Sequence, residues 1–112
     1  YCYAMWKILQ QKEPDDYVIA TGVQYSIKEF INKTARQLNM KIIWKGKGFK
    51  EKAYNEKGAS IIECNKNYFR PLDVNTLIGD AKKARKKLNW KPSVKLETLI
   101  KEMIEFELKF LK

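Results

Sequence analysis

The residues best suited to bind a ligand are Arg70 and Asp73, which lie three positions apart around Pro71. A guanidinium can hold phosphate oxygens through two parallel hydrogen bonds, and a carboxylate can accept hydrogen bonds from sugar hydroxyls. The two side chains therefore have the chemistry needed to bind a nucleotide by its diphosphate and its ribose. Residue types alone leave two alternatives open. Arg70 could form a surface ion pair with Asp73 or Asp80, or Asp73 could cap a helical turn.

The composition limits the kind of protein and the kind of site. The chain has 112 residues, of which 45% are hydrophobic, and a formal charge of +10. This favours a single folded segment that attracts anions, whether phosphorylated metabolites or nucleic acid. With no histidine and with Cys2 and Cys64 far apart, we expect no metal site, and we expect reduced cysteines in a cytoplasmic protein. No apolar run approaches the length of a membrane span, so we expect no membrane partner.

Several familiar kinds of catalytic or cofactor site are missing from the sequence. Gly46-Lys47-Gly48 lacks the third glycine of a dinucleotide-binding turn and is followed by a lysine-rich stretch, so we interpret it as a loop tip. Without histidine, a serine-histidine-acid triad is excluded. Tyr3 and Lys7 match the YxxxK spacing of short-chain dehydrogenases, but with no cofactor site beside them we interpret them as helix surface. We therefore expect neither catalytic nor cofactor-binding residues in this chain.

The basic run over residues 82–87 has two interpretations. It could bind nucleic acid through phosphate contacts. However, Ala81, Ala84 and Leu88 fall on one helical face and leave the cations on the other, which is typical of a solvated surface helix. We favour the solvated helix and expect no nucleic-acid partner, while a small basic nucleic-acid-binding domain remains the alternative function.

Periodicity and turn residues predict an α/β fold with a small sheet. Ser26 and Glu29 have the spacing of a capping box, so a helix should run from there to about residue 39. Asp80 should cap a helix over residues 81–88, and Pro92 should end it. The other expected elements are helices over 1–12 and from about 96, strands over 17–21, 41–44 and 60–63, and a loop over 45–59. The last helix should bury Leu96, Leu99, Ile100, Met103, Ile104 and Leu108.

Several strings of residues spread along the chain are distinctive: Ala4-Met5-Trp6, Glu13-Pro14-Asp15-Asp16-Tyr17-Val18-Ile19-Ala20-Thr21-Gly22, Tyr68-Phe69-Arg70-Pro71, Gly79-Asp80 and Lys87-Leu88-Asn89-Trp90-Lys91-Pro92. Together they resemble the GDP-mannose 4,6-dehydratase family of extended short-chain dehydrogenases/reductases. The resemblance spans nearly the whole chain and corresponds to the C-terminal third of such enzymes.

The resemblance implies a fold and an activity. Residues 1–112 would form the C-terminal substrate-binding lobe, a small mixed sheet with flanking helices, while the Rossmann domain that binds NADP would be absent. The enzymes are lyases that oxidise C4 of GDP-mannose, eliminate water across C5 and C6, and return hydride to C6, which gives GDP-4-keto-6-deoxymannose for GDP-fucose synthesis. We expect a homo-oligomer for the full-length enzyme and no activity for this segment alone. A free-standing nucleotide-sugar binder remains a further alternative.

The resemblance also implies roles for individual residues. Arg70 would bind the diphosphate of GDP-mannose, and Asp73 would bind a ribose hydroxyl where the family more often has glutamate. Lys47, with Lys45, would add positive potential near the nucleotide. The chain begins with Tyr1, and we expect it to be a piece of a longer protein.

Overall fold

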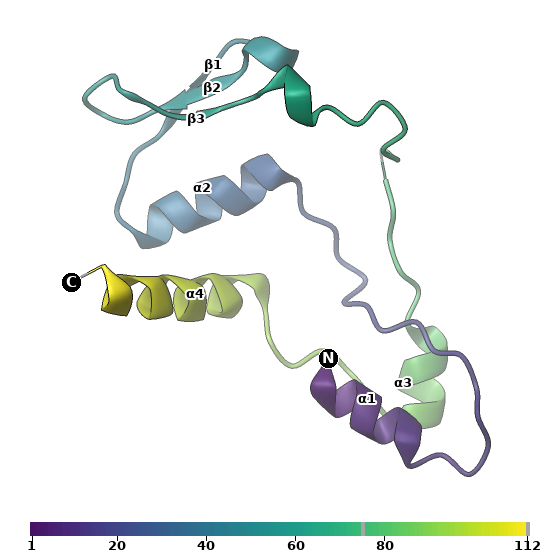
Figure 1. Cartoon of the computed structure of the whole chain (residues 1–112). Coiled ribbons are helices and arrows are strands. Elements are labelled where there is room, and N and C mark those ends of the chain that lie inside the picture. The colour runs from purple at the N-terminus through teal and green to yellow at the C-terminus, as the bar shows by residue number, and fades with distance from the viewer. Residues whose placement is uncertain (75, 112) are drawn as a thin grey trace. The chain divides into compact units, whose positions relative to one another are not determined.

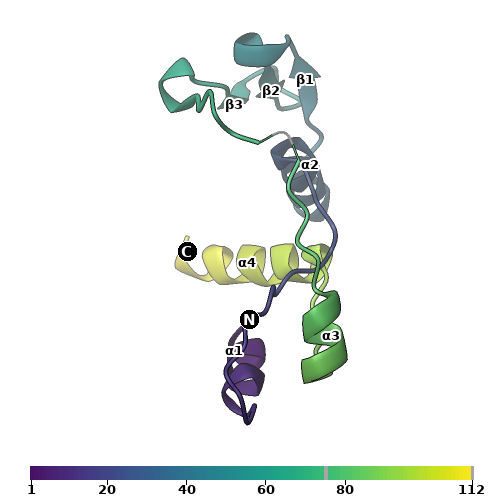
Figure 2. The same ribbon diagram turned by 90° about the vertical axis from the view of Figure 1, so that its right-hand side faces the viewer.

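The computed structural model describes residues 1–74 and 76–111, which divide into two compact units. One unit comprises Tyr1–Gln24 with Val74–Lys95, and the other comprises Tyr25–Asp73 with Leu96–Lys112. Figures 1 and 2 show the elements of both units from two directions. The α/β class is confirmed, since helices accompany a three-stranded sheet.

The first unit is built on two short helices, α1 (Cys2–Leu9) and α3 (Lys82–Leu88), which contact each other. Its core is small and consists largely of alanine, because Ala4 and Ala84 are both 0% exposed. Such small side chains let two helices approach closely. The rest of this core is Ala81, Leu88 and Trp90, with Ile8, Tyr17 and Ile19 packed against it.

The start of α3 follows the predicted capping with a shift of one residue. An Asp80 carboxylate oxygen accepts a hydrogen bond from the backbone N–H of Lys82 at 2.9 Å, and the helix begins at Lys82 rather than at Ala81. The helix ends at Leu88 and is capped by Asn89, which has a left-handed backbone with φ of 46°. Asparagine tolerates this conformation better than most residues, so the end of the helix is encoded locally.

The predicted strand over residues 17–21 is wrong, because these residues join no sheet. The segment instead packs tightly against Gly79, where an added Cβ would lie 2.6 Å from Ala20 Cβ and 3.2 Å from Val18 Cγ1. A strand requires a neighbour that accepts and donates its backbone hydrogen bonds. Within the described residues no such neighbour pairs with this segment, so its β-forming side chains do not make it a strand.

The second unit contains α2 (Ile27–Gln37), β1 (Ile43–Lys45), β2 (Lys52–Tyr54), β3 (Ser60–Glu63) and α4 (Leu96–Phe110). The strands form one sheet in the order β1-β2-β3, and both pairings are antiparallel, so the expectation of a mixed sheet is wrong. The predicted loop over 45–59 is also partly wrong, because β2 lies inside it and follows a 3-10 turn, η1 (Gly48–Lys50). A strand of three residues is too short to show an alternating pattern.

Helix α2 is held by contacts that the sequence partly predicts. The capping box is confirmed, with the Ser26 side chain accepting from the Glu29 backbone N–H and the Glu29 carboxylate accepting from the Ser26 N–H. Trp44 Nε1 on β1 donates to Asn32 Oδ1 at 2.9 Å, which ties the helix to the sheet. Helices α2 and α4 pack side by side, as Figure 1 shows.

The predicted burial of the last helix is wrong for three of the six residues, while Leu96 and Ile104 are half-buried. Ile100 is 1% exposed, whereas Leu99, Met103 and Leu108 remain 45%, 50% and 49% exposed. The reason is that α4 is apolar on more of its circumference than α2 can cover. In the described part of the chain no helix is long and apolar enough to cross a membrane.

Candidate nucleotide-binding surface

Arg70 and Asp73 occupy the two ends of one backbone turn. The Asp73 backbone N–H donates to the Arg70 carbonyl oxygen at 3.3 Å, and Pro71 occupies the second position of this turn, where its fixed φ is favoured. The turn follows a 3-10 turn, η2 (Lys66–Tyr68), whose start is capped by the Asn65 side chain accepting from the Asn67 N–H at 2.9 Å. The structure thus brings the two predicted ligand-binding residues together on one exposed loop.

The side chains of this turn are not used for internal contacts. Arg70 and Asp73 are both exposed, and neither forms a side-chain hydrogen bond or an ion pair with any described residue. Asp80, the other acid considered for Arg70, pairs instead with Lys82 at 3.3 Å between Oδ2 and Nζ. Asp73 likewise caps no described helix. Within the described residues, the two structural alternatives raised by the sequence are therefore not realised.

Lys47 lies on the turn that joins β1 to β2, directly before η1. Gly46 and Gly48 on either side of it have φ of 88° and 56°, values that favour glycine. The Lys47 side chain is exposed and forms no ion pair with a described residue. The predicted loop tip is confirmed as the connection between these strands, and its backbone closes into a turn with the Lys50 N–H donating to the Lys47 carbonyl oxygen at 3.2 Å.

Two phenylalanines join the Lys47 turn to the Arg70 loop. The rings of Phe49 in η1 and Phe69 beside Arg70 meet edge to face, with centroids 4.9 Å apart and an interplanar angle of 86°. Lys66 Nζ lies 5.9 Å from the centroid of the Phe49 ring. The two short helical turns lie next to each other in Figure 1. Lys47, although distant from Arg70 in sequence, is thus on the neighbouring turn.

The surface around this ring pair is positively charged. Four cations lie on the two turns and the loop after them: Lys47, Lys50, Lys66 and Arg70. Two carboxylates of the sheet are engaged elsewhere, since Glu51 pairs with Lys28 and Glu63 pairs with Lys52 at 2.9 Å, which leaves Asp73 as the unpaired acid among the described residues of these turns. The hydrogen bond from Lys52 lowers the pKa of Glu63, and a smaller lowering comes from the hydrogen bond donated by Ser60. The four cations remain unpaired among the described residues, and their combined field would attract an anion.

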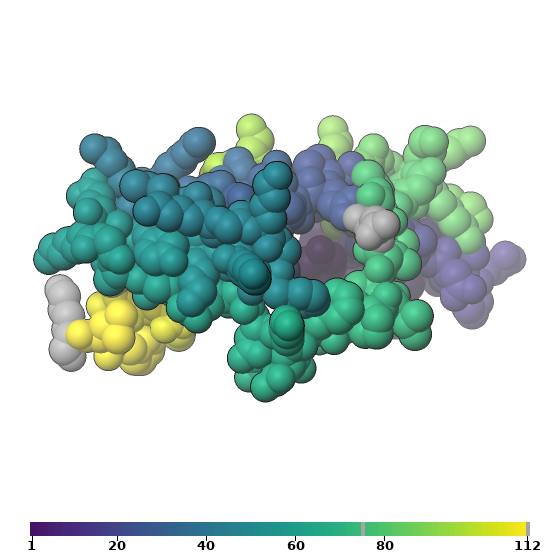
Figure 3. All heavy atoms as spheres, turned by 90° about the horizontal axis from the view of Figure 1, so that it is seen from above, coloured from purple at the N-terminus to yellow at the C-terminus, as the bar shows by residue number. Residues whose placement is uncertain are grey.

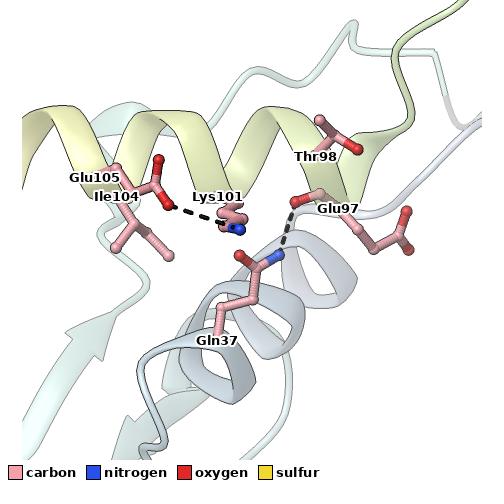
Figure 4. A pocket seen from close by; sticks show the side chains of 6 residues that line it. All are labelled: Gln37, Glu97, Thr98, Lys101, Ile104 and Glu105. Carbon is pink, nitrogen blue, oxygen red and sulfur yellow. Dashed lines mark hydrogen bonds and ion pairs between the residues drawn. The ribbon is translucent and has the colours of Figure 1, made fainter.

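This surface is open rather than enclosed. In Figure 3 the atoms of the sheet and its connecting turns, coloured teal to green, make a continuous surface toward the viewer. One hollow found elsewhere in this unit is the groove between α2 and α4 in Figure 4, where Gln37 Nε2 donates to the Glu97 carbonyl oxygen at 2.8 Å. Its lining includes none of the predicted binding residues: it is formed by Gln37, Glu97, Thr98, Lys101, Ile104 and Glu105.

Two other sequence patterns have structural roles. Lys7 Nζ lies 5.2 Å from the Tyr3 ring centroid and donates to the Leu88 carbonyl oxygen at 2.9 Å, while Tyr3 stacks on Trp6. The YxxxK spacing therefore helps to hold α1 against α3. In the basic run, Lys83 and Lys87 both pair with Asp15, and these hydrogen bonds, from Lys83 first, hold the pKa of Asp15 well below its usual range. This partly neutralises the charge that a nucleic acid would recognise.

Sequence reasoning missed Phe49, Phe69 and Lys66 as parts of this surface. Phe69 adjoins Arg70, but nothing local indicates that its ring meets a residue twenty positions earlier. At Phe49 the available signal was weak: a single aromatic residue inside a glycine- and lysine-rich turn, which does not by itself indicate a packing partner.

Comparison with known proteins places the chain in a family. The profile of a family described as GDP-mannose 4,6 dehydratase matches residues 1–103. The chain is 43% identical over 104 residues to GDP-mannose 4,6 dehydratase 2 of Caenorhabditis elegans, an alignment that covers 93% of this chain and 27% of that protein. It is 39% identical over 113 residues to the human GDP-mannose 4,6 dehydratase, with 100% of this chain and 30% of the human protein covered.

A third relative gives the same picture. The GDP-mannose 4,6 dehydratase of Dictyostelium discoideum is 38% identical over 113 residues, with 100% of this chain and 32% of that protein covered. The chain therefore spans about 27 to 32% of the length of these three relatives. With a matching profile over nearly all of its residues, this chain belongs to the GDP-mannose 4,6-dehydratase family.

Proposed function

We propose that this chain is the part of a GDP-mannose 4,6-dehydratase that holds the GDP moiety of GDP-mannose. The observation that carries the proposal is the Arg70 guanidinium, which is exposed, without an ion-pair partner among the described residues, and next to three further cations. An arginine placed in this way can bind a diphosphate bidentately without first breaking an internal ion pair. Membership of the family supplies the identity of the nucleotide sugar.

The proposed contacts follow from the chemistry of each side chain. Arg70 binds diphosphate oxygens, and Asp73 at the other end of the same turn accepts from a ribose hydroxyl. Lys47 on the neighbouring turn adds positive potential, and its flexible ammonium acts as a point charge rather than as a fork. The ligand would lie across the open surface around Phe49 and Phe69, so its other side needs to be covered by another part of the enzyme.

The reaction of the complete enzyme would remove water from GDP-mannose to give GDP-4-keto-6-deoxymannose. The described residues do not fit NADP. The only glycine pair in a short turn, Gly46 and Gly48, lies between antiparallel strands and leads into a 3-10 turn, whereas a dinucleotide site needs a strand, a glycine turn and an α-helix. We therefore assign NADP and the reacting groups to the part of the relatives that this chain does not match.

We propose that the complete protein acts in the cytoplasm as a homo-oligomer, and that the chain of 112 residues has no dehydratase activity by itself. The exposed apolar side chains of α4, including Leu99 and Met103, are consistent with a chain that contacts further protein.

A thermal-shift comparison tests the proposed ligand. The chain is heated with GDP-mannose, with GMP and with a DNA duplex, each at low and at moderate salt. Because a ligand of the folded state stabilises by RT ln(1 + [L]/Kd), millimolar concentrations are needed to detect a weak site. We expect GDP-mannose to raise Tm more than GMP, since only GDP-mannose carries the diphosphate. If GDP-mannose leaves Tm unchanged while the DNA duplex raises Tm at low salt only, the proposal is rejected in favour of nucleic-acid binding.

A further inference from the structure

The loop that carries Arg70 has few attachments to the rest of its unit. In the described part of the chain, every hydrogen bond made by residues 65–73 stays inside that segment, as in the bonds from Phe69 N–H to the Lys66 carbonyl and from Asp73 N–H to the Arg70 carbonyl. None of these residues forms an ion pair with a described residue. The last backbone bond to a neighbour is from the Cys64 N–H to the Glu51 carbonyl oxygen at 3.3 Å.

The ring of Phe49 makes both of the described side-chain interactions that reach this segment from outside. It meets the Phe69 ring edge to face at 4.9 Å, and Lys66 Nζ lies 5.9 Å from its centroid. Edge-to-face contact is a preferred geometry for aromatic rings because the positive edge of one ring faces the negative face of the other. A cation near the ring face is attracted by the same quadrupole. One side chain therefore contacts both the start of η2 and the residue next to Arg70.

Phe49 lies in a tightly closed turn. Gly46 has φ of 88°, and an added Cβ there would lie 2.1 Å from the Lys50 carbonyl oxygen, so the backbone passes very close to itself. The turn is closed by the bonds from Lys50 N–H to the Lys47 carbonyl at 3.2 Å and from Glu51 N–H to the Gly48 carbonyl at 3.1 Å. Phe49 lies outside the core and is 43% exposed.

We propose that Phe49 is a positioning residue for the Arg70 guanidinium: its ring anchors Phe69 and Lys66, and so fixes the loop from which Arg70 reaches the diphosphate. This inference rests on the proposed function for its ligand and adds a residue that makes no contact with that ligand. Binding is weaker when a loop must be ordered at the moment of association, so an anchor that orders it beforehand raises affinity. Removing the ring should then weaken nucleotide binding mainly through Arg70.

The experiment is a double-mutant cycle on the 112-residue chain, with GDP as the probe and Kd measured by NMR titration. Phe49→Ala should raise Kd about three- to ten-fold, as expected for loss of an aromatic pair, and Phe49→Tyr should restore most of the affinity. In an Arg70→Ala background, Phe49→Ala should have a clearly smaller effect, because only the Asp73 contact with the ribose is then left for the loop to position. Phe106→Ala is the matched control, because Phe106 and Phe110 form another exposed ring pair at 4.8 Å that lies on α4, and it should leave Kd unchanged.

A second readout requires no ligand. The heteronuclear NOE of the Arg70 backbone amide should fall in Phe49→Ala and stay at the wild-type value in Phe49→Tyr and Phe106→Ala. If Phe49→Ala fails to fold by circular dichroism, Phe49→Leu serves in its place, since leucine keeps apolar volume but has no ring edge.

The outcomes separate this inference from the proposed function. Equal effects of Phe49→Ala with and without Arg70, or an unchanged Arg70 NOE, would overturn the positioning role while Arg70 could still bind the diphosphate. Absence of GDP binding by the wild-type chain, or an unchanged Kd in Arg70→Ala, would overturn the proposed function, and the NOE would still decide whether Phe49 orders the loop.

Discussion

Replacing Gly46 by alanine should destabilise the unit that contains the sheet, and the structure allows the cost to be divided into two parts. The first part is conformational, because an L-residue at φ of 88° loses about 1–2 kcal/mol relative to a right-handed backbone. It is reduced by about 0.4–1 kcal/mol because alanine has fewer unfolded conformations than glycine. Taken alone, these two effects predict a net loss of about 0–1.6 kcal/mol.

The second part is steric and specific to this position. The added Cβ would lie 2.1 Å from the Lys50 carbonyl oxygen and 2.7 Å from the Lys50 carbonyl carbon, and both are backbone atoms that no rotamer change can move. Overlaps that force the backbone to shift cost about 1–3 kcal/mol. Gly58 is the matched control, since its φ of 78° is similar but nothing lies within 4 Å of its added Cβ.

The assay is urea unfolding of Gly46→Ala and Gly58→Ala, followed by far-UV circular dichroism and extrapolated linearly to water. Gly46→Ala should have a free energy of unfolding lower than that of Gly58→Ala by about 1–3 kcal/mol, which is the overlap alone. Because folded domains are stable by only about 5–15 kcal/mol, a difference of this size is readily measured. Equal stabilities of the two variants would show that the tight turn before η1 is not as described.

Two further predictions concern the stability of the first unit at acidic pH and the lack of dehydratase activity in the chain alone. Hydrogen bonds from Lys83 and then from Lys87 lower the pKa of Asp15, so its contribution to stability is complete above the unfolded pKa of about 3.9 and is lost as the pH falls through the lower folded value. Asp15→Asn should therefore lower Tm at pH 7 and flatten the loss of Tm between neutral and acidic pH. Asp16→Asn, at a neighbour without an ion pair among the described residues, should leave that profile unchanged, and identical profiles for both variants would contradict the role of Asp15. The chain alone should convert no GDP-mannose when NADP is added, and a 4-keto sugar detected by mass spectrometry would refute our assignment of the reacting groups to other protein.

Elements with strong local signals could be predicted from the sequence. The capping box at Ser26 and Glu29 satisfies backbone N–H groups within a few residues of itself, so no distant contact is needed to place the start of α2. The hydrogen bond from the Lys82 N–H to Asp80 is local in the same sense. The turn that joins Arg70 and Asp73 likewise follows from Pro71, which favours its second position.

Features that depend on distant partners could not be predicted in this way. Residues 17–21 have side chains that favour a strand, but β propensity reflects packing and pairing rather than the backbone alone. The helical spacing of Leu99 and Met103 indicates an apolar face without indicating what covers it. The contact of Phe49 with Phe69 is of the same kind, because it joins two turns through tertiary structure and leaves no periodic pattern.

The central claim is that the Arg70 guanidinium binds the diphosphate of the nucleotide sugar, and a comparison of two arginine variants tests it most directly. Arg36, in the last turn of α2, is exposed and forms no ion pair with a described residue, so Arg36→Ala removes the same charge from the same unit. GDP binding to the chain is measured by calorimetry for wild type, Arg70→Ala and Arg36→Ala. Loss of hydrogen bonds to a charged group costs about 1.5–3 kcal/mol, so Arg70→Ala should weaken binding by about ten-fold or more, while Arg36→Ala stays close to wild type. Equal, small losses in both variants would mean that GDP responds only to net charge and would contradict the assignment.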